Sequence, residues 1–175
     1  GGTGAAPAVA ADNLGIPSMP ALVQAVKSLE DMGVREELSV IISGGVRNGA
    51  DLAKALALGA DAVALGTGVM VAMGCAVCLK CHEGKCAFGI GTQDPERRAR
   101  LDIEKAAQQV ANYIQAMTIE AIILAKAAGK TKLSNLERED IRSLTLEACA
   151  MTGIPLVGSN YTFTDDKFGF FNPSI

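Results

Sequence analysis

Helical patterns alternate with short apolar runs that end in glycine along the first half of the chain. Residues 18–33 place apolar side chains three and four positions apart, which predicts an amphipathic helix capped by Ser18. Residues 39–43 form a β-branched run typical of a strand buried on both faces. A second helix is expected over 51–59 and a second strand over 62–65. This order predicts an α/β fold with a parallel sheet and right-handed crossovers.

The second half of the chain is predicted to be helical. From Asp94, which is expected to cap a helix, apolar residues recur at threes and fours as far as Ala128. Another helix is expected over 137–151, introduced by a capping-box pattern at 134–137. The tail, 156–175, contains four phenylalanines without a clear period. We expect it to pack on a neighbouring surface.

Composition narrows the classes of function. Of the 175 residues, 49% are hydrophobic and 20% charged, which provides a core and makes disorder unexpected. The formal net charge of −3 and the absence of a basic stripe argue against nucleic-acid binding. The apolar stretch 60–76 is too short and too rich in glycine to span a membrane. The chain starts on a glycine-rich turn without a preceding strand, so we expect a fragment, a processed chain or one part of a longer polypeptide.

Two glycine turns follow the two predicted strands directly. One is Ser43-Gly44-Gly45 and the other is Gly66-Thr67-Gly68. Backbone N–H groups freed by such turns, with a helix N-terminus close by, form an anion site. The turns after the last two strands of a (β/α)8 barrel commonly bind a phosphate. The alternative is that these glycines only make tight strand-to-helix turns.

The cysteines are concentrated in one segment. Four of the five fall within twelve residues, at Cys75, Cys78, Cys81 and Cys86. This spacing favours an iron–sulfur cluster over zinc, whose structural sites usually need two separated Cys pairs, and over free core thiols. Cys149 lies on an apolar helix face and is expected in the core, and His82 is expected to hydrogen-bond near the cluster. Clustered cysteines without a signal-like segment favour a reducing, cytoplasmic location.

Five motifs occur in order: Gly1–Pro7, Gly44–Ala60, Gly66-Thr67, Met73-Gly74-Cys75 and Gly89–Pro95. Together they resemble the FMN-binding synthase domain of the glutamate synthase family. The resemblance implies the C-terminal portion of a (β/α)8 TIM barrel with an iron–sulfur loop and extra C-terminal helices. The barrel units would occupy 1–74, the cluster segment 75–94, the helices 95–155 and an irregular tail 156–175.

The resemblance also implies cofactors and their binding residues. The FMN phosphate would meet the turns at Ser43, Gly44, Gly45, Gly66 and Thr67. Gly2, Thr3 and Gly4 would line the flavin and 2-oxoglutarate side. The ligands of a 3Fe-4S cluster map onto Cys75, Cys81 and Cys86. Cys78 is an extra cysteine relative to the family and leaves a 4Fe-4S cluster open.

The implied reaction is the reductive amination of 2-oxoglutarate to L-glutamate, with a hydride from FMN and electrons passed through the cluster. The electron donor would be a ferredoxin or an NAD(P)H-linked subunit. Another chain or domain would complete the barrel and supply glutaminase-derived ammonia, and no catalytic residue can be named. Three alternatives stay open: an N-methylglutamate synthase-type flavin subunit, a non-catalytic iron–sulfur electron-transfer module and a zinc-stabilised scaffold.

Overall fold

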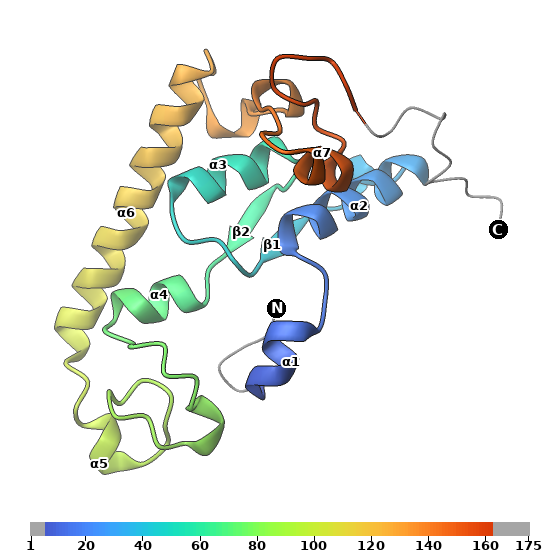
Figure 1. Cartoon of the computed structure of the whole chain (residues 1–175). Coiled ribbons are helices and arrows are strands. Elements are labelled where there is room, and N and C mark those ends of the chain that lie inside the picture. Colours follow the sequence, from blue (N-terminus) through green and yellow to red (C-terminus); the bar gives the residue numbers. More distant parts are fainter. Residues whose placement is uncertain (1–5, 163–175) are drawn as a thin grey trace.

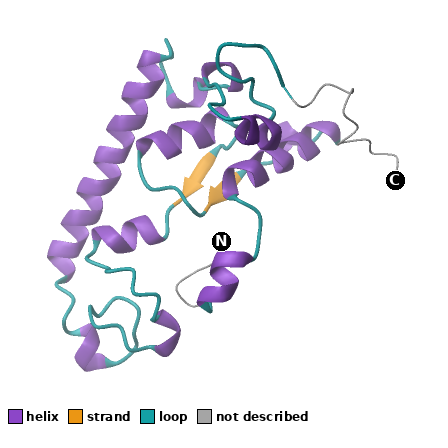
Figure 2. Cartoon of the chain, viewed as in Figure 1, coloured by secondary structure: helices purple, strands orange, loops and turns teal. Residues whose placement is uncertain are grey.

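The computed structural model describes residues 6–162, and its helices outnumber its strands (Figures 1 and 2). The order of the elements is α1 (Ala8–Asn13), α2 (Ser18–Asp31), β1 (Ile41–Ser43), α3 (Gly49–Ala57), β2 (Ala62–Ala64), α4 (Thr67–Ala72), α5 (Pro95–Arg98), α6 (Ile103–Ala127) and α7 (Leu146–Thr152). Short 3-10 helices lie at Arg35–Glu37, Cys81–Glu83, Leu133–Asn135 and Arg138–Asp140. None of the helices within residues 6–162 combines the length and the hydrophobicity that a membrane crossing requires.

The two strands pair in parallel and are joined through α3. In their register Ile41 lies beside Ala62, and Ser43 lies beside Ala64. The two strands, the helix between them and the parallel pairing confirm the predicted α/β class. Each strand is shorter than its apolar run, and the larger barrel remains a prediction.

The main core lies between the sheet, α2 and α3. Its buried members are Leu22, Val23, Val26, Ile42, Ala55, Leu58, Ala60 and Ile154. Each large aliphatic side chain buried here contributes about 1.5–3 kcal/mol relative to an exposed one. Ile154 lies two residues after the end of α7, and α7 contacts α2, so the C-terminal part of the described chain closes over α2, as Figure 1 shows.

An ion pair ties the beginnings of the two strands together. The Asp61 carboxylate accepts hydrogen bonds from the Arg35 guanidinium at 2.9 Å and from the Val40 N–H at 2.7 Å. Arg35 also donates to the Gly59 carbonyl at 2.9 Å. The hydrogen bond from Arg35, followed by that from Val40, lowers the pKa of Asp61 below its ordinary value of 3.8. Because both strands are short, these contacts help to fix the register.

The long helix α6 runs along one side of the molecule, with α3 and α4 against it (Figure 1). Small or flexible side chains face α3, and Met117, Ala121 and Ala125 of α6 are buried. At Gly49 the first turn of α3 meets the α6 backbone so closely that an added Cβ would lie 2.6 Å from the Ala121 nitrogen. The absence of a side chain at Gly49 therefore sets the spacing of the two helices.

The continuous helix expected from Asp94 to Ala128 is in fact two helices. Asp94 does cap α5, because its carboxylate accepts from the N–H groups of Glu96 and Arg97. However, α5 ends at Arg98, and Asp102 takes an extended conformation and accepts from the Lys105 N–H to cap α6. A second strong N-cap inside the apolar pattern therefore restarts the helix.

The helix expected over 137–151 is also wrong in its first half. The chain is extended at Ser143, which pairs with Leu156 as a parallel bridge, and α7 begins only at Leu146 after the Thr145 cap. A capping box does occur, but it joins Glu137 to Asp140 rather than Ser134 to Glu137. Cys149 is completely buried, as predicted.

The start of α2 was predicted at Ser18, and the helix does begin there, but Pro17 holds the cap position and no side chain caps it. The phenylalanines of the tail and the residues Gly2, Thr3 and Gly4 lie outside the described residues.

Candidate functional site

The two glycine turns lie side by side at the carboxyl edge of the sheet. Because Ser43 pairs with Ala64, the turns that follow start at the same level. Gly44 and Gly45 have φ values of +103° and +76°, a region in which side chains other than hydrogen are strained. The Ser18 hydroxyl lies 3.2 Å from the point where a Gly44 Cβ would be. Conformation and close approach therefore both require glycine at position 44.

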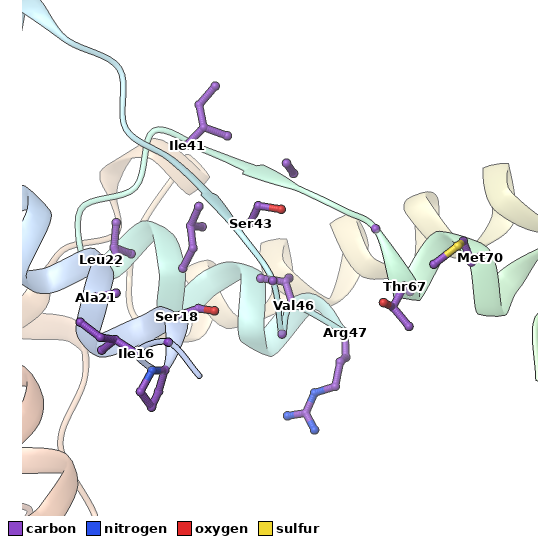
Figure 3. Close-up of a pocket in the computed structure, with 18 of the residues that line it drawn as sticks. Ile16, Ser18, Ala21, Leu22, Ile41, Ser43, Val46, Arg47, Thr67 and Met70 are labelled. Carbon is purple, nitrogen blue, oxygen red and sulfur yellow. The ribbon is translucent and has the colours of Figure 1, made fainter. Parts of the chain in front are cut away.

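A cavity of about 1280 Å³ lies against both turns. Figure 3 shows residues from the start of α2, the turn after β1 and the start of α4 around it. The predicted residues that border the cavity are Ser43, Gly44, Gly45, Gly66 and Thr67. A Cβ built on Gly66 would meet no atom within 4 Å, so the backbone is open to a ligand there. The cavity exceeds the usual size of small-ligand pockets and has room for a dinucleotide-sized or flavin-sized molecule.

The beginning of α3 is not available to an anion, contrary to expectation. Its neighbouring N–H groups already donate to side chains: Arg47 to the Asp51 carboxylate at 3.1 Å, Gly49 to the Glu120 carboxylate at 2.8 Å, and Asp51 to the Asn48 amide oxygen at 2.9 Å. Two carboxylates therefore occupy this helix start.

By contrast, no side chain of the described residues caps α4, which begins at Thr67 after Gly66. The first N–H groups of α4 therefore have no side-chain cap among the described residues, and the positive end of the peptide dipoles lies at this turn. The anion-binding capacity of the carboxyl edge is consequently concentrated at Gly44–Gly45 and at the start of α4.

Three further residues that the sequence patterns did not assign to this site line the cavity. Ser18 looked like a helix cap but points its hydroxyl at the Gly44 turn (Figure 3). Arg47 lies just beyond that turn, and its Nε contacts the Asp51 carboxylate at 3.1 Å. Tyr113 comes from α6, more than forty residues away from either turn, and its hydroxyl donates to the Arg47 carbonyl at 2.9 Å. No local pattern could have linked Tyr113 to this cavity, because only the packing of α6 brings it there.

The four clustered cysteines lie between α4 and α5. Cys86 is buried, Cys75 and Cys81 are half-buried and Cys78 is exposed. Between the first and third of them, Val77 and Leu79 have φ values of +52° and +57°. Left-handed backbone is unusual for a β-branched residue and is found most often at functional sites. The conformation of this loop is therefore held by something other than local preference.

The loop around Cys86 is well braced. Arg97 of α5 donates to the Lys85 carbonyl at 3.0 Å, and Arg100 donates to the Ala87 carbonyl at 3.4 Å. The Cys86 sulfur faces several backbone N–H groups, which lower the pKa of its thiol. The N–H of Gly91 has the largest effect, and those of residues 88–90 add to it. A sulfur surrounded by amide donors is stabilised as a thiolate, the form in which cysteine binds metals.

The donor chemistry of this segment fits an iron–sulfur cluster, but the ligands do not converge. The Cys81 sulfur lies 3.4 Å from an ideal Cβ on Gly91, whose N–H faces Cys86, so these two cysteines share one neighbour. Within residues 6–162, however, no group of three or more His, Cys, Asp or Glu side chains is arranged to hold a metal ion. Metal binding would have to draw the set together, as is usual where ligation and folding are coupled. The His82 Nε2 lies 4.0 Å from a carboxylate oxygen of Glu83. A hydrogen bond from His82 near the cluster stays a prediction.

A family model described as the conserved region in glutamate synthase matches residues 1–131. The chain belongs to the glutamate synthase family. The match contains both glycine turns, the cavity between them and all four clustered cysteines, and it confirms the resemblance read from the five motifs.

Individual relatives agree with this assignment. The "Glutamate synthase large subunit-like protein" of Rhizobium meliloti (strain 1021) is 44% identical over 177 residues, which cover 92% of this chain and 40% of the relative. The "Archaeal glutamate synthase (NADPH)" of Methanocaldococcus jannaschii is 49% identical over 148 residues, which cover 83% of this chain and 29% of the relative. The "Glutamate synthase large subunit-like protein YerD" of Bacillus subtilis (strain 168) is 36% identical over 141 residues, which cover 81% of this chain and 27% of the relative. This member of the glutamate synthase family thus spans less than half the length of each of these three relatives.

Proposed function

We propose that this chain provides the phosphate end of the FMN site and the iron–sulfur segment of a glutamate synthase, an oxidoreductase that converts 2-oxoglutarate and ammonia into L-glutamate. The observation that carries the proposal is the pairing of β1 with β2. In this register two glycine turns open onto one cavity within the region that matches the family. Neither turn alone would distinguish a ligand site from an ordinary strand-to-helix connection.

The residues present fit the phosphate of FMN. The turn at Gly44 and Gly45 and the uncapped start of α4 at Gly66 and Thr67 provide backbone N–H groups without obstructing side chains. The Thr67 and Ser43 hydroxyls, both on the cavity lining, can donate further hydrogen bonds. We propose that Gly2, Thr3 and Gly4 line the flavin and 2-oxoglutarate side.

When bound, FMN would supply the hydride that reduces the iminium formed from 2-oxoglutarate and ammonia. The contribution of this chain is to bind and orient the cofactor. Among the described residues that line the cavity, only Arg47 and Tyr113 have ionisable side chains, and no carboxylate or imidazole is present to serve as a general base. We therefore assign substrate binding and proton transfer to groups outside the described residues, consistent with the 29–40% of the length of the first two relatives that the chain covers.

We propose that Cys75, Cys81 and Cys86 hold a 3Fe-4S cluster, with Cys78 as the residue that would complete a 4Fe-4S cluster. The cluster would supply single electrons from a ferredoxin or an NAD(P)H-linked subunit in the cytoplasm. The amide groups around the Cys86 sulfur and the braces from Arg97 support this role. The remaining strands of a (β/α)8 barrel and the source of ammonia would come from other domains or subunits.

The test uses the polypeptide as it is naturally encoded, purified without oxygen. We expect it to release FMN on heating, to contain iron and acid-labile sulfide, and to form glutamate from 2-oxoglutarate and ammonium with a chemical reductant. Methylamine with glutamate is offered in parallel. Formation of N-methylglutamate instead would assign the chain to the other synthase, and iron without flavin would leave an electron-transfer module. A colourless protein with one zinc per chain would refute the proposal.

A charge test isolates the phosphate site. Thr67 is exposed at the first position of α4, where an acidic residue stabilises a helix by about 0.3–1 kcal/mol. Thr67→Asp should therefore keep or raise stability, yet weaken FMN binding by at least about 100-fold, because a carboxylate would face the phosphate. Thr67→Asn, of the same shape without the charge, should weaken it much less. If both variants retain FMN equally well, the side chain of Thr67 does not lie against the phosphate.

A further inference from the structure

Tyr113 contacts the segments that follow both strands, although it belongs to neither. Its hydroxyl donates to the Arg47 carbonyl at 2.9 Å, two residues after the Gly44–Gly45 turn. The same side chain lies against Gly68 in the first turn of α4, so closely that a Cβ on Gly68 would be 3.2 Å from Cζ and closer still to the hydroxyl oxygen. Tyr113 also lines the cavity itself.

Arg47 is held from two directions. Its N–H and its Nε both contact the Asp51 carboxylate at 3.1 Å, which ties it to α3. Tyr113 ties its carbonyl to α6. The bond from Tyr113 joins the turn after β1 directly to α6, the helix against which α4 also packs, while the bond from the Gly49 N–H to Glu120 joins the start of α3 to the same helix.

We infer that Tyr113 is a positioning residue for the flavin phosphate, which fixes the distance between the turn after β1 and the start of α4. This inference rests on the proposed function, because it assumes that one phosphate is shared by the two turns. A phosphate bound by N–H groups from two separate segments is held only if their spacing is set in advance. Tyr113 sets it through a hydrogen bond on one side and van der Waals contact on the other.

One substitution, Gly68→Ala, should weaken FMN binding without lowering the stability of the fold. In Gly68→Ala the new methyl group would occupy the place of the Tyr113 hydroxyl, which is the free end of a side chain and can swing away. Alanine favours the helix over glycine, so α4 is not weakened. The variant should therefore lose the hydrogen bond to Arg47 while the fold remains as stable as before.

The test measures the FMN dissociation constant and the urea midpoint for the wild type, Gly68→Ala, Tyr113→Phe and the double variant, in the naturally encoded polypeptide stripped of flavin. Each single variant should raise the dissociation constant about 2- to 10-fold, the range for one lost hydrogen bond. In the double variant the Gly68→Ala change should add less than about 2-fold, because the bond that it disrupts is already absent. The midpoint of Gly68→Ala should stay at or above that of the wild type.

A structural role without positioning predicts a different result, in which the midpoint falls together with the affinity. That outcome, or full additivity in the double variant, or unchanged dissociation constants in both single variants, would overturn the role of Tyr113 while the proposed function stands. A wild type that binds no FMN would overturn the proposed function and this role with it. As a matched control, Tyr161→Phe removes the hydroxyl of the other tyrosine, which does not line the cavity, and should leave FMN affinity unchanged.

Discussion

The contact between Gly49 and α6 gives a quantitative prediction about the fold. A Cβ at Gly49 would lie 2.6 Å from the Ala121 nitrogen and within 3.0 Å of the Met117 carbonyl oxygen and the Glu120 Cβ. Ordinary contacts of a Cβ begin near 3.4 Å, so Gly49→Ala requires the helices to separate by about 1 Å to clear the Met117 carbonyl oxygen. Two of the three obstructing atoms belong to the backbone of α6 and cannot rotate aside.

The cost can be estimated from its parts. Overpacking of this kind costs about 1–3 kcal/mol, and loss of the 2.8 Å bond from the Gly49 N–H to Glu120 adds about 1 kcal/mol. The lower entropy of alanine in the unfolded chain returns about 0.4–1 kcal/mol. We expect Gly49→Ala to lower the free energy of unfolding by about 1–3.5 kcal/mol.

Gly68→Ala is the matched control, since it places a methyl group equally close to an atom of α6 at the start of another helix. There the obstructing atom is the tip of Tyr113 rather than backbone, and the expected change is within about 0.5 kcal/mol. Urea unfolding followed by circular dichroism should show a midpoint lower by about 1 M for Gly49→Ala only. Equal midpoints for the two variants would refute the argument that rigid backbone contact sets the helix spacing.

Two further outcomes follow from the ion pair and from the cysteines. Asp61→Asn removes the negative charge that pairs with Arg35 and leaves a weaker amide acceptor for Arg35 and Val40, and should cost about 1 kcal/mol at pH 7, a modest value because the pair is partly exposed to solvent. The pKa of Asp61 is lowered in the fold, so its contribution to stability is fully present above its ordinary pKa of 3.8 and is lost as the pH falls through the lower folded pKa. The urea midpoints of the variant and the wild type should therefore converge below about pH 4, and a gap that persists there would contradict the assignment. Cys86→Ser should abolish bound iron and the part of the visible absorption that comes from the cluster, whereas Cys78→Ser should retain both, and loss of iron in Cys78→Ser would instead indicate a four-cysteine cluster.

The strands and glycine turns were predictable because each depends on local chemistry. A β-branched run at 39–43 and the glycines that follow it at positive φ specify a strand and its turn without long-range information. The shared register of β1 and β2 follows from the general geometry of parallel pairs. The sequence could therefore place Gly44 and Gly66 at one edge of the sheet.

The parts that failed depend on competition between distant groups. The apolar pattern through Leu101 gave no sign that Asp102 would outcompete helix continuation by capping α6. Likewise, Ser143 forms a parallel bridge to Leu156, and the helical spacing of apolar residues over 137–151 gave no sign of it. Tyr113 and Glu120 act on the cavity edge only because α6 packs across α3 and α4, and that packing is a property of the folded chain.

The two helix starts at the carboxyl edge differ in whether side chains already occupy their N–H groups. The Asp51 and Glu120 carboxylates accept from the N–H groups of Arg47 and Gly49 near α3, whereas no side chain of the described residues caps α4 at Gly66 and Thr67. The charge of Asp51 is in turn paired with Arg47, a cation on the cavity lining. An anionic group would therefore find amide donors at α4 rather than at α3. The edge thus favours one orientation of an elongated ligand, with its anionic end towards α4, before the rest of that ligand makes contact.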